Sequence, residues 1–313
     1  MNRRNFLMSS ACACLATATA KIGSLLAQEP PAVPKIKYRC GTPLPSPAKQ
    51  IQSRRVVAAL RAHRVVFRGT TTIPVRFHVI HEGERGYLPD RQLKAQVELL
   101  NRVYEPASVK FEIADVNLHE NSDWFWHEPG SEQEIEMKTE LGKEPTRSLN
   151  IYTAEPGTGL LGYATFPWWL KDTPQLDGVV LHHASLPEAS RPWIDQPWPF
   201  DLGMTAVHEI GHWCGLYHTF QNGCEPPGDD VDDTAFEANP AAGCPLNQPS
   251  ACQGETRFNP VENYMDYSDD SCMKEFTALQ YQRIKDMLGY HRPELNPLTT
   301  RSALLDQIRK SIE

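Results

Sequence analysis

The motif HEIGHWCGLYH, which runs from His208 to His218, constrains the fold more than any other stretch of the sequence. His208 and His212 are four residues apart, so on a helix they lie on the same face and can bind one metal ion. Gly215 can adopt the left-handed conformation that ends a helix, so the chain can turn there and bring His218 back as a third ligand. The motif therefore predicts a helix, a glycine turn and a zinc site built from three imidazoles.

The chemistry that this motif predicts is metal-assisted hydrolysis. Three neutral histidines on zinc leave one position open for water, and such an ion lowers the pKa of water from about 15.7 to about 7. Glu209 is placed to take a proton from that water and to give it later to a leaving amine. No activated serine or cysteine nucleophile is signalled, so no covalent intermediate is expected. The alternative, two histidines on a solvated helix face, leaves Gly215 and His218 unexplained.

Residues 1–27 are expected to be a signal peptide of the twin-arginine type. Arg3 and Arg4 precede an apolar run, a small-x-small cleavage site ends at Ala20, and cleavage after Ala27 is also open. An ordinary secretory signal with two adjacent arginines is the alternative. No other stretch approaches the roughly 20 apolar residues of a membrane span, and a net charge of −8 disfavours a nucleic-acid partner. The mature chain is therefore expected to be secreted or periplasmic.

Residues 28–70 are expected to form a prosegment or extended arm, not part of a core, because the stretch is rich in proline and then in arginine. The basic run from Arg54 to Arg68 is the expected protease-sensitive link to the next domain. Cys40, within the arm, could occupy the open zinc position and keep the enzyme latent, because a thiolate is a strong zinc ligand. A disulfide to Cys214 and a free thiol are the alternatives.

Residues 71–292 are expected to form the catalytic domain, and residues 293–313 a helical tail. The periodicity of apolar residues predicts strands at 73–81, 109–116 and 148–154 and a helix at 132–141.

The segment from Gly178 to His183 is the candidate for part of the sheet at the cleft edge. In a zinc peptidase, a protein or peptide substrate binds there as an additional extended strand. Its two histidines, His182 and His183, are expected to face solvent.

The region after the zinc motif is rich in cysteine and aspartate. Cys224, Cys244, Cys252 and Cys272 lie in an exported segment, so two disulfides are expected, with three pairings open. The stretch GDDVDDT supplies hard oxygen ligands in a loop, which favours a calcium site over a solvated acidic loop.

Several motifs together resemble one family. Residues 263–267, NYMDY, resemble the methionine turn that lies beneath the zinc in metzincin peptidases. With HEIGHWCGLYHTFQNGC, GDDVDDT, ENYMDYSDDSCM and the arm motif RCGTP, the chain resembles the pappalysins, also called cytophagalysins, over roughly residues 38–290. The resemblance implies an α+β fold. Its twisted, mostly parallel sheet would have an antiparallel edge strand with backing and active-site helices, followed by a loop-rich, disulfide-bonded C-terminal subdomain.

The resemblance also implies roles for particular residues. The zinc ligands would be His208, His212 and His218, with Glu209 as general base, Met265 as the apolar floor, Tyr267 steadying the tetrahedral intermediate and Cys40 as the latency switch. The implied disulfides are Cys224–Cys252 and Cys244–Cys272, and the implied calcium ligands are Asp229, Val231, Asp233 and Thr234. Two positions depart from the family pattern: Cys214 replaces a leucine and Ala235 replaces a proline.

Two other classes of function compete with a zinc endopeptidase. One is an exported zinc-containing binding or adhesion protein without turnover, in which Glu209 would be idle and a fourth protein ligand would close the site. The other is a zinc hydrolase that acts on non-peptide substrates. The sequence gives neither the oligomeric state nor the residue preferred beside the cut.

Overall fold

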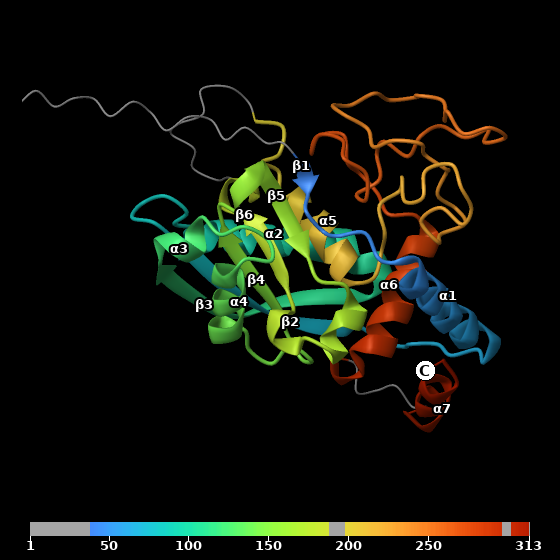
Figure 1. Ribbon diagram of the computed structural model, residues 1–313, viewed down its shortest axis with the longest axis horizontal. Coiled ribbons are helices and arrows are strands. Elements are labelled where there is room, and N and C mark those ends of the chain that lie inside the picture. Colours follow the sequence, from blue (N-terminus) through green and yellow to red (C-terminus); the bar gives the residue numbers. More distant parts are fainter. Residues whose placement is uncertain (1–37, 188–197, 296–301, 313) are drawn as a thin grey trace, which may run out of the picture. The chain divides into compact units, whose positions relative to one another are not determined.

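A mixed sheet of six strands lies at the centre of the computed structural model, which describes residues 38–187, 198–295 and 302–312 (Figure 1). The strand order is β1-β5-β6-β4-β2-β3. The strands are β1 (Tyr38–Cys40), β2 (Thr71–His81), β3 (Val109–Glu120), β4 (Leu149–Ala154), β5 (Leu160–Ala164) and β6 (Val179–His182). β2, β3, β4 and β6 pair in parallel, and β5 pairs antiparallel with β6. The expected α+β architecture, mostly parallel with one antiparallel strand toward the edge, is confirmed.

The pattern of side chains explains which strands are central. Every residue of β4 and β6 is buried, as expected for parallel strands that are covered on both faces. β3 lies at one edge of the sheet, and its first residues alternate: Val109 and Phe111 are buried, whereas Lys110 and Glu112 are exposed. The sheet therefore presents two apolar faces, each of which needs a layer of helices.

Helices cover both faces of the sheet. The α-helices of the described residues are α1 (Pro47–Ala62), α2 (Asp90–Tyr104), α3 (Ser122–Phe125), α4 (Glu132–Leu141), α5 (Met204–Trp213), α6 (Ala278–His291) and α7 (Ser302–Ile312). Short 3-10 turns are η1 (Glu105–Ala107), η2 (Gly157–Gly159), η3 (Pro167–Lys171), η4 (Pro174–Leu176), η5 (His183–Ser185) and η6 (Pro293–Leu295). Ile151 and Val179 point into the main core with α2, α5 and α6, whereas Tyr152 and Val180 point to the opposite face with α3 and α4.

The arm is not simply extended: part of it forms a strand and a helix that pack against the rest of the chain, although outside the main core cluster. β1 pairs in parallel with β5, at the free edge of the sheet. After it, the Ser46 side chain accepts a hydrogen bond from the Lys49 backbone and caps α1. Buried Val56 and Leu60 of α1 pack in a second apolar cluster that includes residues of α6 and α7. The composition of the arm, rich in proline and then in arginine, does not indicate this helix.

The link between arm and domain is shorter than the basic run predicts. Arg54 lies inside α1, so the chain there is helical and not an open link. Residues 63–70 connect α1 to β2, and within them Arg68 and Gly69 are exposed. The main core cluster spans Ile73 to Leu295 and, among the described residues, takes no side chain from the arm.

A loop-rich subdomain connects α5 to α6. It contains turns but no α-helix in residues 214–277, all of which are described. Two disulfides, Cys224–Cys252 and Cys244–Cys272, cross-link it, and this is the pairing that the resemblance implies. Each closes a loop with a sequence separation of 28 residues, for which a loop-entropy estimate gives about 3.6 kcal/mol of stabilisation.

The expected signal peptide, residues 1–27, and the first residues of the arm lie outside the described residues. Among the helices of the described ranges, none combines the length and the apolar character that crossing a membrane requires.

Candidate zinc and catalytic site

Helix α5 supplies the first half of the site and ends where the sequence predicts. Its residues from Thr205 to Trp213 are all buried, so its two histidines face protein and not bulk water. Gly215 has φ +94°, and its backbone N–H donates to the His212 carbonyl, while the Leu216 N–H donates to the Gly211 carbonyl. This pair of bonds is the Schellman arrangement, which needs a left-handed residue after the helix. The turn reverses the chain and carries His218 back toward α5.

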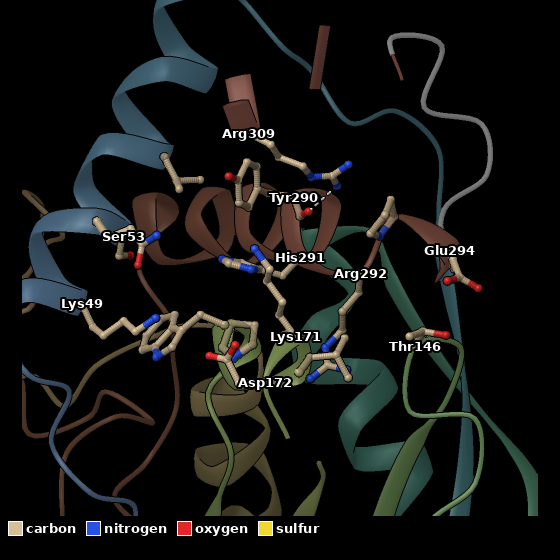
Figure 2. A pocket seen from close by; sticks show the side chains of 16 residues that line it. Lys49, Ser53, Thr146, Lys171, Asp172, Tyr290, His291, Arg292, Glu294 and Arg309 are labelled. Atoms are coloured by element: carbon tan, nitrogen blue, oxygen red, sulfur yellow. Dashed lines mark hydrogen bonds between the residues drawn. The ribbon is translucent and has the colours of Figure 1, made fainter. Parts of the chain in front are cut away.

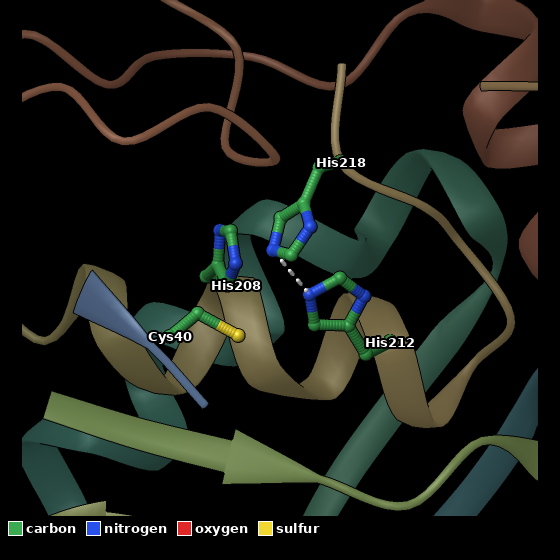
Figure 3. Close-up of side chains that lie close together, drawn as sticks. All are labelled: Cys40, His208, His212 and His218. Carbon is green, nitrogen blue, oxygen red and sulfur yellow. Dashed lines mark hydrogen bonds between the residues drawn. The ribbon is translucent and has the colours of Figure 1, made fainter. Parts of the chain in front are cut away.

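The three imidazoles converge (Figure 3). His212 Nε2 and His218 Nε2 are 3.0 Å apart, and one ligand atom from each of His208, His212, His218 and Cys40 lies within 4.8 Å of the others. The His212 ring is nearly perpendicular to the other two, at 86° to His208 and 84° to His218. Ring planes that cross in this way can direct lone pairs at a common point, as a tetrahedral ion requires.

Hydrogen bonds at the far side of the rings fix which nitrogen is free. His208 Nδ1 lies 2.7 Å from the Tyr264 carbonyl and His212 Nδ1 lies 2.8 Å from the Leu216 carbonyl, so both Nδ1 atoms carry the hydrogen. His208 Nε2 is then a bare lone pair, buried and without a hydrogen-bond partner. Burial lowers the pKa of His212 to about 4 and that of His208 well below its ordinary value. The donor set therefore fits zinc, which binds neutral imidazole.

Glu209 lies beside the histidines and is fully buried. Its Oε2 accepts a hydrogen bond from the Thr42 hydroxyl at 2.9 Å and faces the Cys40 thiol at 3.4 Å. Burial raises the pKa of Glu209 to about 8, although the bonds from Thr42 and Cys40 act in the opposite direction. A carboxyl group with a pKa near neutrality suits a residue that must both take and give a proton.

The methionine turn lies directly beneath this constellation. Met265 is fully buried, and a Cβ on Gly211 would lie 2.5 Å from its sulfur, so only glycine allows the turn to approach α5 so closely. The Tyr267 ring packs against the His218 ring with centroids 5.0 Å apart, and its hydroxyl donates to the Cys40 carbonyl at 3.4 Å. Burial raises the pKa of Tyr267, so its hydroxyl stays protonated and can donate.

The arm crosses the site and makes contacts that sequence reasoning missed. Arg39 Nη2 lies 2.7 Å from Asp270 Oδ1, with both side chains buried, and the guanidinium stacks 5.2 Å from the Phe200 ring. The Thr42 hydroxyl accepts from the Ala164 backbone N–H at 2.9 Å and donates to Glu209. Arg39 and Thr42 flank Cys40 in the RCGTP motif, but their partners are more than a hundred residues away in sequence.

The relatives of this chain are metallopeptidases. The family sequence model described as pregnancy-associated plasma protein-A matches residues 194–289. "Extracellular metalloprotease" of Pyricularia oryzae is 38% identical over 269 residues, which are 82% of this chain and 90% of that protein. A protein of the same name from Verticillium alfalfae is 37% identical over 268 residues, with the same coverage. This chain belongs to the pappalysin family.

Solved structures agree with this assignment. Mature mirolysin of Tannerella forsythia, in complex with a cleaved peptide, is similar to this pappalysin with TM-score 0.61 and 27% identity, over 74% of this chain and 97% of that chain. Promirolysin shares the fold with TM-score 0.66 and 24% identity, over 88% of this chain and 98% of that chain. The chain is therefore a metalloendopeptidase of the pappalysin type with a metzincin fold.

The segment from Gly178 to His183 belongs to the sheet of this pappalysin, as expected, but it is not the strand at the edge. β6, within residues 178–183, is paired on both sides, with β4 and with β5. The outermost strand at the site, apart from the arm, is β5, and its outer edge pairs with β1 of the arm. Continuous apolar runs make both strands, so periodicity could not tell which one lies at the edge.

His182 and His183 are buried, not solvent-facing as expected. With Glu155 they form a second cluster of groups that are able to bind metal. Their two rings, however, are stacked at 19°, so their in-plane lone pairs run nearly parallel and do not meet at one ion. Arg85 occupies both oxygens of Glu155, at 2.6 and 2.8 Å. This cluster therefore reads as a buried charge network and not as a metal site.

The acidic loop is only partly arranged as expected. Asp229 is buried, its Oδ1 accepts from the Val231 N–H and the Thr234 hydroxyl, and its Oδ2 has no hydrogen-bond partner. Asp233 instead turns toward α6, where it accepts from the Thr277 hydroxyl and the Leu279 N–H. Its carboxylate is thus engaged at a helix N-terminus and does not face Asp229.

A cavity of about 440 Å³ lies away from the catalytic residues, between α1, η3 and the C-terminal end of α6 (Figure 2). Lys49, Lys171 and Arg309 point toward it, but Arg309 already donates to the Tyr290 carbonyl. No zinc-motif histidine and no residue of β5 lines this cavity, so it has no part in the site described above.

Proposed function

We propose that this pappalysin is a secreted zinc endopeptidase that is held latent by its own arm. The observation that carries the proposal is the convergence of His208, His212 and His218 beside Glu209, with Cys40 of the arm on the open side. His208, His212 and His218 would hold the zinc. Zinc supplies a Lewis acid that polarises the scissile carbonyl and makes water more acidic.

The residues of the chain would divide the remaining work. Glu209 takes a proton from the attacking water and gives it to the departing amine, which needs one carboxyl group within reach of both. Tyr267 donates its hydroxyl hydrogen to the developing oxyanion. Met265 supports the histidines from below through its contact with Gly211.

The substrate would bind along β5 as an added strand. The outer edge of β5 now serves the arm: the Gly162 carbonyl accepts from the Gly41 N–H at 2.9 Å, and the Ala164 N–H donates to Thr42. A peptide that replaces the arm would use these same two backbone groups. Mature mirolysin was solved in complex with a cleaved peptide, which supports a peptide as the substrate.

Latency would depend on the same contact, in which the arm occupies the substrate site. The Cys40 sulfur lies among the imidazoles, where a thiolate can take the fourth position on zinc. Both Cys40 and Cys214 are free and buried, so the alternative disulfide between them is not formed. We propose residues 28–70 as the prosegment, 71–292 as the catalytic domain and 293–313 as the tail. Release would follow a cut in the exposed connection at 63–70.

Release of the arm would leave Asp270 as a buried carboxylate beside the metal site. Arg39 now neutralises it, and an unpaired buried charge is costly. A basic side chain of the substrate is therefore the expected replacement, so we propose that one residue of the cleavage site is arginine or lysine.

Export and calcium complete the proposal. The related fungal proteins are named as extracellular metalloproteases, which supports secretion, and residues 1–27 would direct it through a twin-arginine signal. A structural calcium ion would use the unpartnered Asp229 Oδ2 with carbonyl oxygens of Val231 and Thr234. Asp233 is left out of this ligand set because of its contacts with α6.

The two competing classes are less well supported. A binding protein has no use for a buried Glu209 directed at the metal site, and a non-peptide hydrolase has no use for the strand edge of β5. The metalloprotease names of the relatives favour the same choice.

Glu209→Gln tests the proposed function, with Glu98→Gln on the exposed side of α2 as the matched control. We expect Glu209→Gln to retain zinc but to cleave peptides about 10²- to 10⁴-fold more slowly, because it can no longer carry the proton. The measurement is digestion of a peptide library with mass spectrometry, after release of the arm. Unchanged cleavage by Glu209→Gln would end the peptidase proposal.

A further inference from the structure

A second hollow opens beside the arm, on the same strand edge as the metal site. Its volume is about 330 Å³, and Gly41 and Pro43 of the arm lie on its rim. The walls are mostly apolar and come from one turn and four elements: Pro129 in the turn, Ile135 of α4, Tyr163 of β5, Trp169 of η3 and Leu176 of η4. We call this hollow the α4 pocket.

Among the described residues, the charged side chains that line the α4 pocket are Glu134 and Lys138, and they neutralise each other. Glu134 and Lys138 form an ion pair at 2.7 Å, one helical turn apart, and both are nearly buried. The Lys138 ammonium also lies 5.2 Å from the centre of the Tyr163 ring. A charged ligand group would find no free counter-charge here, whereas an apolar group would cover apolar wall.

The path of the arm relates this pocket to the metal site. Three positions follow one another along it: Arg39 pairs with Asp270, Cys40 lies among the imidazoles, and Pro43 lies at the α4 pocket. The Asp270 site and the α4 pocket therefore lie on opposite sides of the metal site. From residue 39 to residue 43, an extended chain spans about 13 Å, at roughly 3.3 Å per residue.

We propose that the α4 pocket is a specificity pocket of the released enzyme, which receives an apolar side chain of the substrate. This inference rests on the proposed endopeptidase function. The substrate presents a basic side chain at Asp270 on one side of the cleaved bond and an apolar side chain at Ile135, Trp169 and Leu176 on the other, three or four residues away. The substrate class is thus an extended peptide with this two-part pattern.

The test uses two substitutions at one exposed position. Ile135 is 45% exposed on the surface of α4, so replacing it leaves the core intact. The assay measures the rate at which the arm-released enzyme cleaves peptides that carry leucine, aspartate or lysine at the pocket position. The intact chain, in which the arm covers the site, is the control without cleavage. The wild-type enzyme is expected to favour leucine about tenfold. Ile135→Glu shifts the preference toward lysine and Ile135→Lys toward aspartate, while the preference on the Asp270 side stays unchanged.

Leu118→Glu is the matched control, because Leu118 is a 50% exposed leucine on β3, far along the sheet from β5. Binding of the same peptides to Glu209→Gln is measured as well, so that the pocket is tested separately from catalysis. Equal cleavage and binding of the leucine, aspartate and lysine peptides would overturn the pocket and leave the peptidase intact. A shift of preference by Leu118→Glu as large as that by Ile135→Glu would overturn it also.

Discussion

In the proposed latent form, the Thr42 hydroxyl would hold the arm in place separately from the Cys40 sulfur. It forms hydrogen bonds with two groups that the proposed substrate and reaction would use, the Glu209 carboxyl and the Ala164 N–H, each at 2.9 Å. Replacing Thr42 by valine keeps the shape of the side chain and removes both bonds. The arm is then expected to open more often.

The size of the effect follows from these two bonds. Because its pKa of about 8 leaves Glu209 mostly protonated at neutral pH, the bond from Thr42 is one to a neutral acceptor and contributes about 0.5 kcal/mol at the low end. A buried N–H left without an acceptor costs about 1 kcal/mol or more. Since about 1.4 kcal/mol is a tenfold change in an equilibrium, the open population should rise at least roughly tenfold. The effect belongs to the arm and should vanish in the released enzyme.

The assay is alkylation of the free thiols in the full chain, followed by mass spectrometry. Cys40 is buried by the closed arm and reacts only when the arm opens, whereas Cys214 is fully buried in the main core and serves as the internal control. Thr42→Ser retains the hydroxyl and should react like the wild type. Cys40 labelling of Thr42→Val at the wild-type rate would refute the reasoning, as would equally fast labelling of Thr42→Ser.

Two further predictions concern stability. Gly215→Ala should lower the free energy of unfolding by about 1–3 kcal/mol, because φ is +94° and the new Cβ would lie 2.9 Å from Met287. The measurement is urea unfolding. Gly254→Ala is the control that isolates the steric part, since Gly254 has a similar φ but no atom within 4 Å of the new Cβ. Burial alone would raise the pKa of Glu155, but hydrogen bonds from His183 and Arg85 lower it from 4.5 to about 2. The contribution of Glu155 to stability is therefore present above pH 4.5 and is lost as the pH falls toward 2. Glu155→Gln should remove that part of the pH dependence of Tm. If Tm of the variant and of the wild type depended on pH in the same way, the network would not stabilise the fold.

The arrangement of the zinc motif could be predicted from the sequence because it depends on residues that are close together in the chain. The helical spacing of His208 and His212 and the glycine at 215 predict where the helix ends and where His218 returns, and the structure has this arrangement. Strands and helices with clear periodicity, such as Glu132–Leu141, are predicted for the same reason.

The errors arise where packing decides between local alternatives. β5 and β6 are both short apolar runs, and only the strand order places β5 at the edge. The arm helix has local signals, Ser46 at the cap position and Pro47 directly after it. The composition of the whole stretch, rich in proline and then in arginine, instead predicts an extended arm. The contacts of Arg39 with Asp270 and of Thr42 with Glu209 span 231 and 167 residues, so no local pattern encodes them.

X-ray absorption spectroscopy with metal analysis on the purified full chain tests the metal site most directly. We predict one zinc per chain with three nitrogen neighbours and one sulfur neighbour, and loss of the sulfur signal after the arm is released or in Cys40→Ser. A chain without stoichiometric zinc, or one whose sulfur signal survives Cys40→Ser, would contradict the account.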